Sequence, residues 1–441
     1  MKKFSVGAVT KFYLPLMLQA FSQSVTYPLV AGIVTRGEFG VNALTAFTQG
    51  LMIMFMIGAL GAGLVTTGLI FAKTRYGYDT FRRLNALMMA ALLTLQCIPS
   101  LPPFDRWVFE GFFALPPDLA KIAARVLLCG TVMNAGFFLR NVPMVVLFNN
   151  YESGKANNAT ILRILVTLAL SYFFPALGWI GPDWGLLALT LGVWCEYLLT
   201  WYYARPYVAE LQSPALNSQP STLNLLFEQF RFTMPLALGG FLLATSPLVI
   251  ASFVGRTADA ADMLVIHYVT LGVANPVAYG ALRMQPVAVK FLPEYPGDRR
   301  LLWYAIAVGL LLGVIPLAFA TPWLAHLYFG VYQNVPEKLL PTVRLAIAIY
   351  GAISVIHAVR ARIEGIAAAR KRPKAVMAGQ IAYTVSLLAV CAAMLPSGCS
   401  GWTIAITAIF VAPVSTALTV YASLAFYDIL LRKNSIGEKT T

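Results

Sequence analysis

Charged residues are scarce in this chain of 441 residues. Asp, Glu, Lys and Arg make up 11% of it and hydrophobic residues 59%, whereas about a quarter of a soluble globular protein is charged. This scarcity argues against a soluble protein. Apolar runs such as Leu51–Ala72 and Leu301–Ala320 reach the length of roughly 20 residues that spans a bilayer core. The sequence therefore predicts a polytopic, all-α membrane protein in contact with membrane lipid.

Histidine and cysteine are also few, and their spacing matches no metal site. The chain has three His and five Cys, and the cysteines are scattered through apolar runs without the pattern of a disulfide framework. No HExxH, GxSxG or Gly-rich phosphate loop occurs. We therefore predict that the protein is not an enzyme, needs no cofactor or metal, and does not use ATP to drive transport.

Basic residues outnumber acidic ones, and the formal net charge is +14. In a membrane protein such an excess is better explained by topology than by nucleic-acid binding. If the N-terminus is cytoplasmic, most Lys and Arg residues that flank the apolar runs, Arg163 among them, fall on the cytoplasmic side. We predict no nucleic-acid partner, a location in the cytoplasmic (inner) membrane, and both termini in the cytoplasm.

The apolar runs predict twelve membrane-spanning helices. These cover residues 11–34, 44–72, 84–102, 122–149, 159–179, 184–204, 230–254, 263–290, 301–326, 341–368, 375–396 and 402–431. A polar stretch rich in Pro and Ser separates the sixth helix from the seventh. We predict an N-terminal six-helix bundle over residues 1–204, a cytoplasmic linker over 205–229, and a C-terminal six-helix bundle over 230–441.

The two halves carry matching residues at a nearly constant spacing. Pro15 and Pro235 lie early in the first and seventh helices, and Arg140 and Arg360 lie on the fourth helix of each half; both pairs are 220 residues apart. The loops YGYDTFRRL and PEYPGDRRL match as well. Several matches at one spacing indicate a parallel repeat. We predict two bundles related by a pseudo-two-fold axis along the membrane normal, as in carriers that bind cargo between two bundles.

Four arginines remain after the other Lys and Arg residues are assigned to one face of the membrane or the other, and all four lie within predicted spans: Arg140, Arg283, Arg360 and Arg362. An Arg at the bilayer centre costs about 3 kcal/mol on insertion scales, so it usually faces a wet cavity or a partner. On the tenth helix His357, Arg360 and Glu364 share one face at i, i+3 and i+7. Arg362 points away from that face and is placed to snorkel toward headgroups.

Other intramembrane polar residues leave two interpretations open. Gln19 and Gln23 share a face of the first helix, where they either contact cargo or hold helices together. Glu196 on the sixth helix is either a proton carrier or half of a structural ion pair. Arg360 either contacts cargo or pairs with Glu364.

The charges of the predicted cavity favour an anionic cargo, because arginines outnumber acids there. The planar guanidinium also suits carboxylate and phosphate groups. Arg283 lies between Pro276 and Pro286, and the backbone carbonyls that prolines free are tolerated where a helix lines a cavity. We predict that the substrate-binding residues are Arg140, Arg283, Arg360, His357, Gln19 and Gln23. We predict that Glu364 and Glu196 gate or couple transport.

The sequence resembles the multidrug/oligosaccharidyl-lipid/polysaccharide (MOP) exporter superfamily, which includes MATE-like carriers, and within it is similar to the progressive ankylosis family. The resemblance is carried by the stretches Met234–Arg256, Tyr268–Phe291 and Ala358–Gly379. It implies efflux of small polyanions such as pyrophosphate, nucleotides or citrate. Arg360, and Pro276 with Gly280 around Arg283, are the positions that this resemblance carries over.

The resulting prediction is a monomeric, secondary-active, alternating-access transporter that exports a small polyanion. Drug exporters of the superfamily resemble one another in having an acid in the first helix, where this chain has Gln19, Ser22 and Gln23. This difference argues against drug or cation antiport. The alternatives are a flippase for a lipid-linked saccharide, a multidrug/cation antiporter, and a membrane scaffold or sensor that transports nothing.

Overall fold

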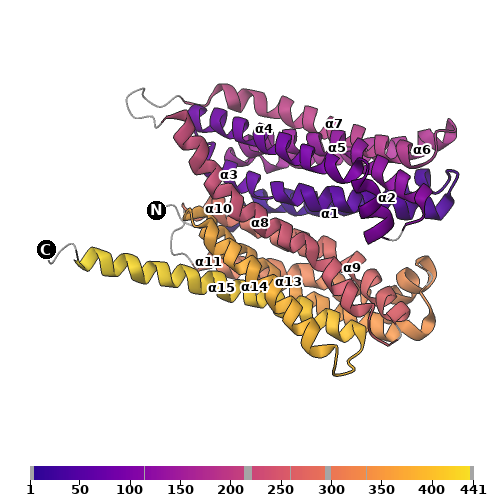
Figure 1. Cartoon of the computed structure of the whole chain (residues 1–441). Coiled ribbons are helices and arrows are strands. Elements are labelled where there is room, and N and C mark those ends of the chain that lie inside the picture. The colour runs from indigo at the N-terminus through magenta and orange to yellow at the C-terminus, as the bar shows by residue number, and fades with distance from the viewer. Residues whose placement is uncertain are drawn as a thin grey trace. The chain divides into compact units, whose positions relative to one another are not determined.

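The computed structural model describes residues 4–113, 115–212, 221–258, 260–293, 299–333 and 335–437. Within them, the side chains of residues 22–28, 41, 261, 332 and 428–437 lie outside the description. The described residues form helices joined by short turns, and no strand occurs among them (Figure 1). The prediction of an all-α fold is therefore confirmed.

The helices group into two compact units. The N-terminal unit covers Leu14–Phe241. It contains most of α1 (Val6–Val34), α2 (Gly40–Gly58), α3 (Gly63–Phe71), α4 (Arg75–Cys97), α5 (Pro117–Asn149), α6 (Ser153–Ala176), α7 (Pro182–Ala209) and the first part of α8 (Thr222–Val254). Residues 213–220 of the predicted linker lie outside the described residues, and the cytoplasmic location of residues 205–229 stays a prediction.

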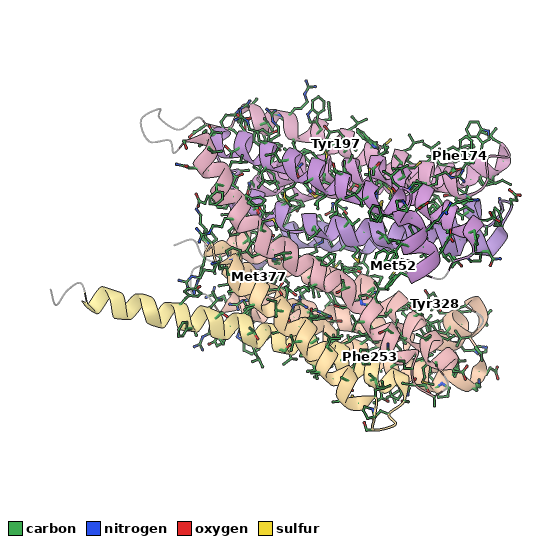
Figure 2. The ribbon with its side chains drawn as sticks, viewed as in Figure 1. Met52, Phe174, Tyr197, Phe253, Tyr328 and Met377 are labelled. Carbon is green, nitrogen blue, oxygen red and sulfur yellow. The ribbon has the colours of Figure 1, made fainter. Side chains whose placement is uncertain are left out.

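The C-terminal unit consists of Met1–Tyr13 and Leu242–Thr441. Besides the start of α1 and the end of α8, it contains α9 (Ala260–Leu282), α10 (Met284–Phe291), α11 (Arg300–Phe319), α12 (Pro322–Ala325), α13 (Leu340–Ala369), α14 (Pro373–Met394) and α15 (Gly401–Gly437). Side chains from α8, α9, α13, α14 and α15 form most of its apolar core, and Phe253 and Tyr328, both labelled in Figure 2, pack against that core.

The observed helices match the twelve predicted ones in order. Ten helical stretches of the described residues are long and apolar enough to cross a membrane. The other two predicted spans correspond to α1, whose described apolar part is Val6–Phe21, and to α4, which is longer than 20 residues but more polar. Three predicted spans are each broken into two α-helices among the described residues. The breaks lie at Ala59–Gly61 between α2 and α3, at Arg283 between α9 and α10, and at Ala320 and Thr321 between α11 and α12.

The start of α4 differs from the prediction. YGYDTFRRL was predicted to be a loop, but α4 begins at Arg75 and includes it. The Thr74 hydroxyl accepts a hydrogen bond from the Gly77 N–H at 3.2 Å, which caps the helix. Arg75 and Asp79 then form an i,i+4 ion pair at 3.1 Å. Residues 294–298 of the matching stretch in the second half lie outside the described residues.

The two units repeat one succession of backbone features, as the sequence spacing predicts. Tyr151 and Lys371 have positive φ values of 61° and 55°, and Gly178 and Gly398 have values of 76° and 68°. The members of each pair are 220 residues apart. The same spacing separates two π-helical segments, Arg106–Phe112 and His326–Tyr332. Two six-helix units with a common plan therefore build the chain.

Small residues bring α11 and α13 into close contact within the C-terminal unit. A Cβ atom at Gly313 would lie 2.5 Å from the Gly351 carbonyl oxygen, and one at Gly309 would lie 2.5 Å from the Val355 Cα. Spacing small residues four apart on one helix lets two membrane helices approach backbone to backbone.

We expect Gly313→Val to lower the apparent melting temperature of the detergent-purified chain, because the added side chain must push α11 away from α13. Overpacking of this kind costs about 1–3 kcal/mol. Gly272→Ala is the matched control, since a Cβ there meets nothing within 4 Å and Ala favours helix. Equal melting of both variants would contradict the close packing.

Candidate functional site

Two buried polar networks lie inside the two units. Apart from His267, the buried Arg, Lys, His, Asp and Glu side chains among the described residues are Arg140, Arg163, Arg360, Glu196 and Glu364. Gln19, Arg140, Thr160, Arg163 and Glu196 form what we call the N-terminal network. Arg360, Glu364 and Gln380 form the C-terminal network. Each network lies within one unit and joins different helices of it.

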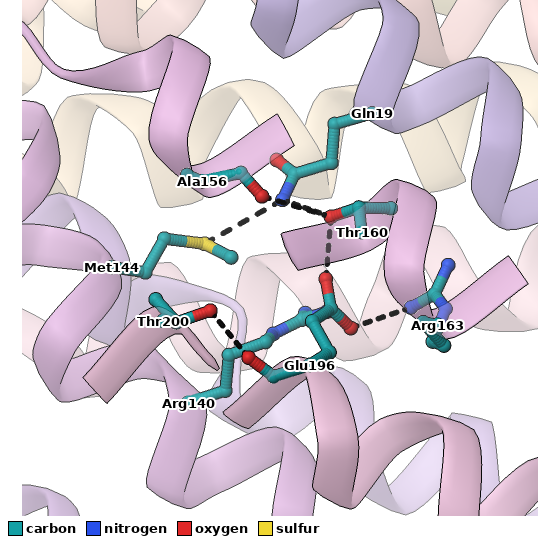
Figure 3. A network of polar contacts seen from close by, with 8 residues as sticks. All are labelled: Gln19, Arg140, Met144, Ala156, Thr160, Arg163, Glu196 and Thr200. Atoms are coloured by element: carbon teal, nitrogen blue, oxygen red, sulfur yellow. Dashed lines mark hydrogen bonds and ion pairs between the residues drawn. The ribbon is translucent and has the colours of Figure 1, made fainter. Parts of the chain in front are cut away.

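Glu196, on α7, is the centre of the N-terminal network (Figure 3). Its Oε2 atom accepts hydrogen bonds from Arg140 Nη1 at 2.6 Å and from Arg163 Nη1 at 3.0 Å. Its Oε1 atom accepts a hydrogen bond from the Thr160 hydroxyl. Gln19 Nε2 in turn donates to the Thr160 oxygen at 2.9 Å. The network therefore connects α1, α5, α6 and α7.

This network holds two guanidinium groups and one carboxylate. Arg140, Arg163 and Glu196 have relative exposures of 8%, 2% and 0%, so solvent screens their charges little. The Nε atoms of Arg140 and Arg163 are buried and have no hydrogen-bond partner among the described residues. The two guanidinium groups carry two positive charges and Glu196 carries one negative charge, so the N-terminal network has a net charge of +1. It also has N–H donors that make no hydrogen bond with the described residues.

The C-terminal network is closed. Arg360 Nε donates to Glu364 Oε1 at 2.8 Å, and Arg360 Nη2 donates to Gln380 Oε1 at 2.9 Å. Gln380 Nε2 donates to the same carboxylate oxygen at 2.7 Å. The Arg360 guanidinium also lies over the Tyr383 ring, 5.1 Å from its centroid, a favourable cation–π distance. One cation faces one anion, and each of the three side chains is hydrogen-bonded to the other two.

The two networks occupy equivalent places in the repeat. At a spacing of 220 residues the pairs are Arg140 and Arg360, Thr160 and Gln380, Arg163 and Tyr383, Met144 and Glu364, and Glu196 and Thr416. Both units thus have the arginine, on α5 in the N-terminal unit and on α13 in the C-terminal unit. Its carboxylate partner lies on α7 in the N-terminal unit and on α13 itself in the C-terminal unit.

Several predicted site residues are partners in these networks. Of the two interpretations left open for Arg360, the pair with Glu364 is the one observed. Glu196 forms ion pairs with Arg140 and Arg163, which is the second of the two interpretations left open for it. Gln19 holds α1 against α6 through Thr160. These contacts favour structural roles for Arg360, Glu364 and Gln19.

The remaining predicted residues lie elsewhere. Arg283 stands at the junction of α9 and α10, where its backbone N–H donates to the Gly280 carbonyl at 3.2 Å. The Tyr13 hydroxyl donates to that same carbonyl at 3.0 Å. His357 is half-buried on α13, and its Nδ1 atom has no partner among the described residues. The side chain of Gln23 lies outside the described residues.

The sequence prediction counted Arg163 among the basic residues of the cytoplasmic side, close to the predicted start of the fifth span at residue 159, and not among the intramembrane arginines. Helix α6 begins at Ser153, which places Arg163 about 15 Å along the helix with its side chain only 3% exposed. Thr160, Arg163 and Thr167 are all buried and spaced i, i+3 and i+7, and this polar stripe is the signal that could have revealed it.

We expect Arg360→Leu to lower the apparent melting temperature strongly, because Glu364 is then left buried without its cation. Breaking a buried ion pair costs about 3–5 kcal/mol. The double variant Arg360→Leu with Glu364→Leu should recover most of that loss, since it leaves no charge behind. Melting of the single variant at the wild-type temperature would contradict the closed network.

Comparison of the sequence with family models and with the curated proteins finds no match. The fold does match solved structures. The chain is 17% identical to a MATE mutant, with a TM-score of 0.76, over 95% of this chain and 96% of the other. It is 18% identical to a multidrug resistance MATE family transporter of the MOP superfamily in an outward-facing conformation, with a TM-score of 0.72, over 98% and 100%.

A third similar structure is a MOP superfamily transporter from Pyrococcus furiosus. It is 16% identical, with a TM-score of 0.70, over 96% of this chain and 99% of the other. The description of that protein says that the reverse polarity of its binding pocket suggests a different function. This chain therefore has the fold of the MATE transporters of the MOP superfamily. The narrower resemblance to the progressive ankylosis family stays a prediction.

Proposed function

We propose that the chain is a secondary membrane transporter that exports a small anion. The observation that carries this proposal is the unequal charge of the N-terminal network, where Arg140 and Arg163 share the single carboxylate of Glu196. The similarity of the fold to MATE transporters supports transport, and the ten apolar helical stretches support a membrane location.

Burying a charged side chain in a membrane costs free energy. An arginine deep in a membrane costs about 3 kcal/mol on insertion scales, and such residues usually mark substrate or ion pathways. One guanidinium of the N-terminal network is compensated by Glu196, and the other is left in excess. An anionic cargo would offset that excess, whereas a cationic cargo would increase it. Pyrophosphate, nucleotides and citrate are the cargo classes that the progressive ankylosis resemblance implies.

Multidrug or cation antiport is the second candidate. One similar structure is described as a multidrug resistance transporter, and the fold alone suits either cargo. The positive net charge of the N-terminal network favours the anion.

The proposal also includes the cytoplasmic (inner) membrane as the location, with both termini in the cytoplasm. It further includes a monomeric state, with membrane lipid as the surrounding partner.

The proposal is tested by ligand-dependent melting of the purified chain in non-ionic detergent. A ligand that binds only the folded state at 100 times its Kd stabilises that state by about 2.7 kcal/mol. We expect pyrophosphate, ATP or citrate to raise the apparent melting temperature. Stabilisation by ethidium alone would favour cation antiport, and stabilisation by an undecaprenyl-diphosphate analogue alone would favour a lipid-linked saccharide flippase.

A further inference from the structure

We infer that the N-terminal network contains an oxyanion subsite on Arg140 and Arg163, which binds a carboxylate or phosphate group of a soluble anion. The inference rests on the proposed function and narrows it to one unit and to two side chains. In the C-terminal network, Arg360 is the equivalent of Arg140, and the inference gives it a structural role only.

The hydrogen-bond donors of the N-terminal network point to such a ligand. A guanidinium has five N–H donors, yet the hydrogen bonds of both Arg140 and Arg163 with described residues go only to Glu196. Their Nε atoms are buried without a partner among these residues. Unpaired buried donors are costly, and an oxyanion offers the planar acceptor geometry that guanidinium groups bind best.

The charge of the network points the same way. Arg140 comes from α5 and Arg163 from α6, and their Nη1 atoms meet at one oxygen of Glu196. Two cations held against one carboxylate attract a further anion rather than a neutral or cationic group. The Arg140 side chain is 10% exposed and that of Arg163 is 3% exposed. Arg140 is therefore the side chain that an arriving anion reaches first.

The C-terminal network serves as an internal comparison within the same chain. Tyr383 stands where the N-terminal network has Arg163, so no second cation is present there. Arg360 uses both Nε and Nη2 on Glu364 and Gln380. With its charge balanced and these donors occupied, this network has no comparable attraction for an anion.

The experiment measures binding of radiolabelled pyrophosphate and of radiolabelled citrate to the full-length chain, purified in non-ionic detergent without anionic lipid. We expect Arg163→Met to raise Kd about tenfold or more, since a charge-assisted hydrogen bond of this kind is worth roughly one such factor. Arg163→Met leaves Arg140 and Glu196 as a one-to-one pair, which favours folding. Arg163→Lys keeps the charge but loses the forked donor, and we expect an intermediate Kd.

Arg125→Met is the matched control. It removes one positive charge from the same unit at an exposed ion pair with Asp183 and should bind as the wild-type chain does. Should Arg163→Met fail to fold, Arg163→Lys decides the matter: wild-type affinity in that variant would overturn the inference.

The failure of this inference is distinguishable from the failure of the proposed function. Loss of binding in the double variant Arg360→Met with Glu364→Met, combined with wild-type affinity in Arg163→Met, would move the subsite to the C-terminal network and overturn the inference. The proposed function would still stand. Absence of binding to both anions in the wild-type chain would overturn the proposed function itself.

Discussion

Glu196→Gln is expected to lower the apparent melting temperature of the purified chain by roughly 10 °C. The amide keeps the shape of the side chain and removes its charge, so Arg140 and Arg163 both lose the carboxylate that they share. Removing one partner of a buried ion pair costs about 3–5 kcal/mol. For a unit of this size each kcal/mol corresponds to about 2–4 °C.

The control for this change is Glu210→Gln, which makes the same substitution at an exposed position after the end of α7 and should leave the melting temperature unchanged. Adding Arg163→Met to Glu196→Gln should recover part of the loss, because it removes one of the two uncompensated cations. If Glu196→Gln melts as Glu210→Gln does, the two arginines do not depend on Glu196.

The second large effect concerns the position of the acid. In the C-terminal network the carboxylate lies four residues after the arginine on the same helix, and the equivalent position in the N-terminal unit is Met144. Met144 is buried, and its sulfur lies 4.0 Å from Gln19 Nε2. We expect Met144→Glu to recover at least half of the melting temperature that Glu196→Thr loses, because Arg140 then regains an i,i+4 partner.

The double variant copies the arrangement of the other unit, with Thr at the position of Thr416 and Glu at that of Glu364. The matched control places the same acid on the same helix two turns before the arginine, about 10 Å away along the axis and too far for an ion pair, as Met133→Glu in the Glu196→Thr background. Met133 is also buried, and we expect that variant to melt lower still. Equal melting of the two double variants would show that the units do not share one network plan.

The helices could be predicted from the sequence because each span is a long apolar run, and burial in lipid leaves few other solutions for the backbone. Helix ends were harder to predict. The first turns of α4 and α6 contain Arg75, Asp79 and Lys155, and hydropathy assigns such residues to loops. Local contacts, such as the Thr74 cap and the Arg75 to Asp79 pair, hold these turns in the helix.

The site could be predicted only in part. Arg140 and Arg360 stood out because an arginine is conspicuous in an apolar span, and their equal spacing marked the repeat. The sequence did not reveal that Glu196 is the acid partner of Arg140. Glu196 lies on another helix, and the equivalent position in the second half is Thr416, which is not an acid. Arg163 was hidden by the late start predicted for its helix. Contacts between helices far apart in sequence require the structure.

Transport by proteoliposomes tests the central claim most directly. The wild-type chain, Arg163→Met and Arg125→Met are each reconstituted, and uptake of labelled pyrophosphate and citrate is followed beside that of ethidium. The account predicts anion uptake well above that of protein-free liposomes for the wild-type chain and Arg125→Met, and loss of it in Arg163→Met. Ethidium uptake without anion uptake in the wild-type chain would contradict the account.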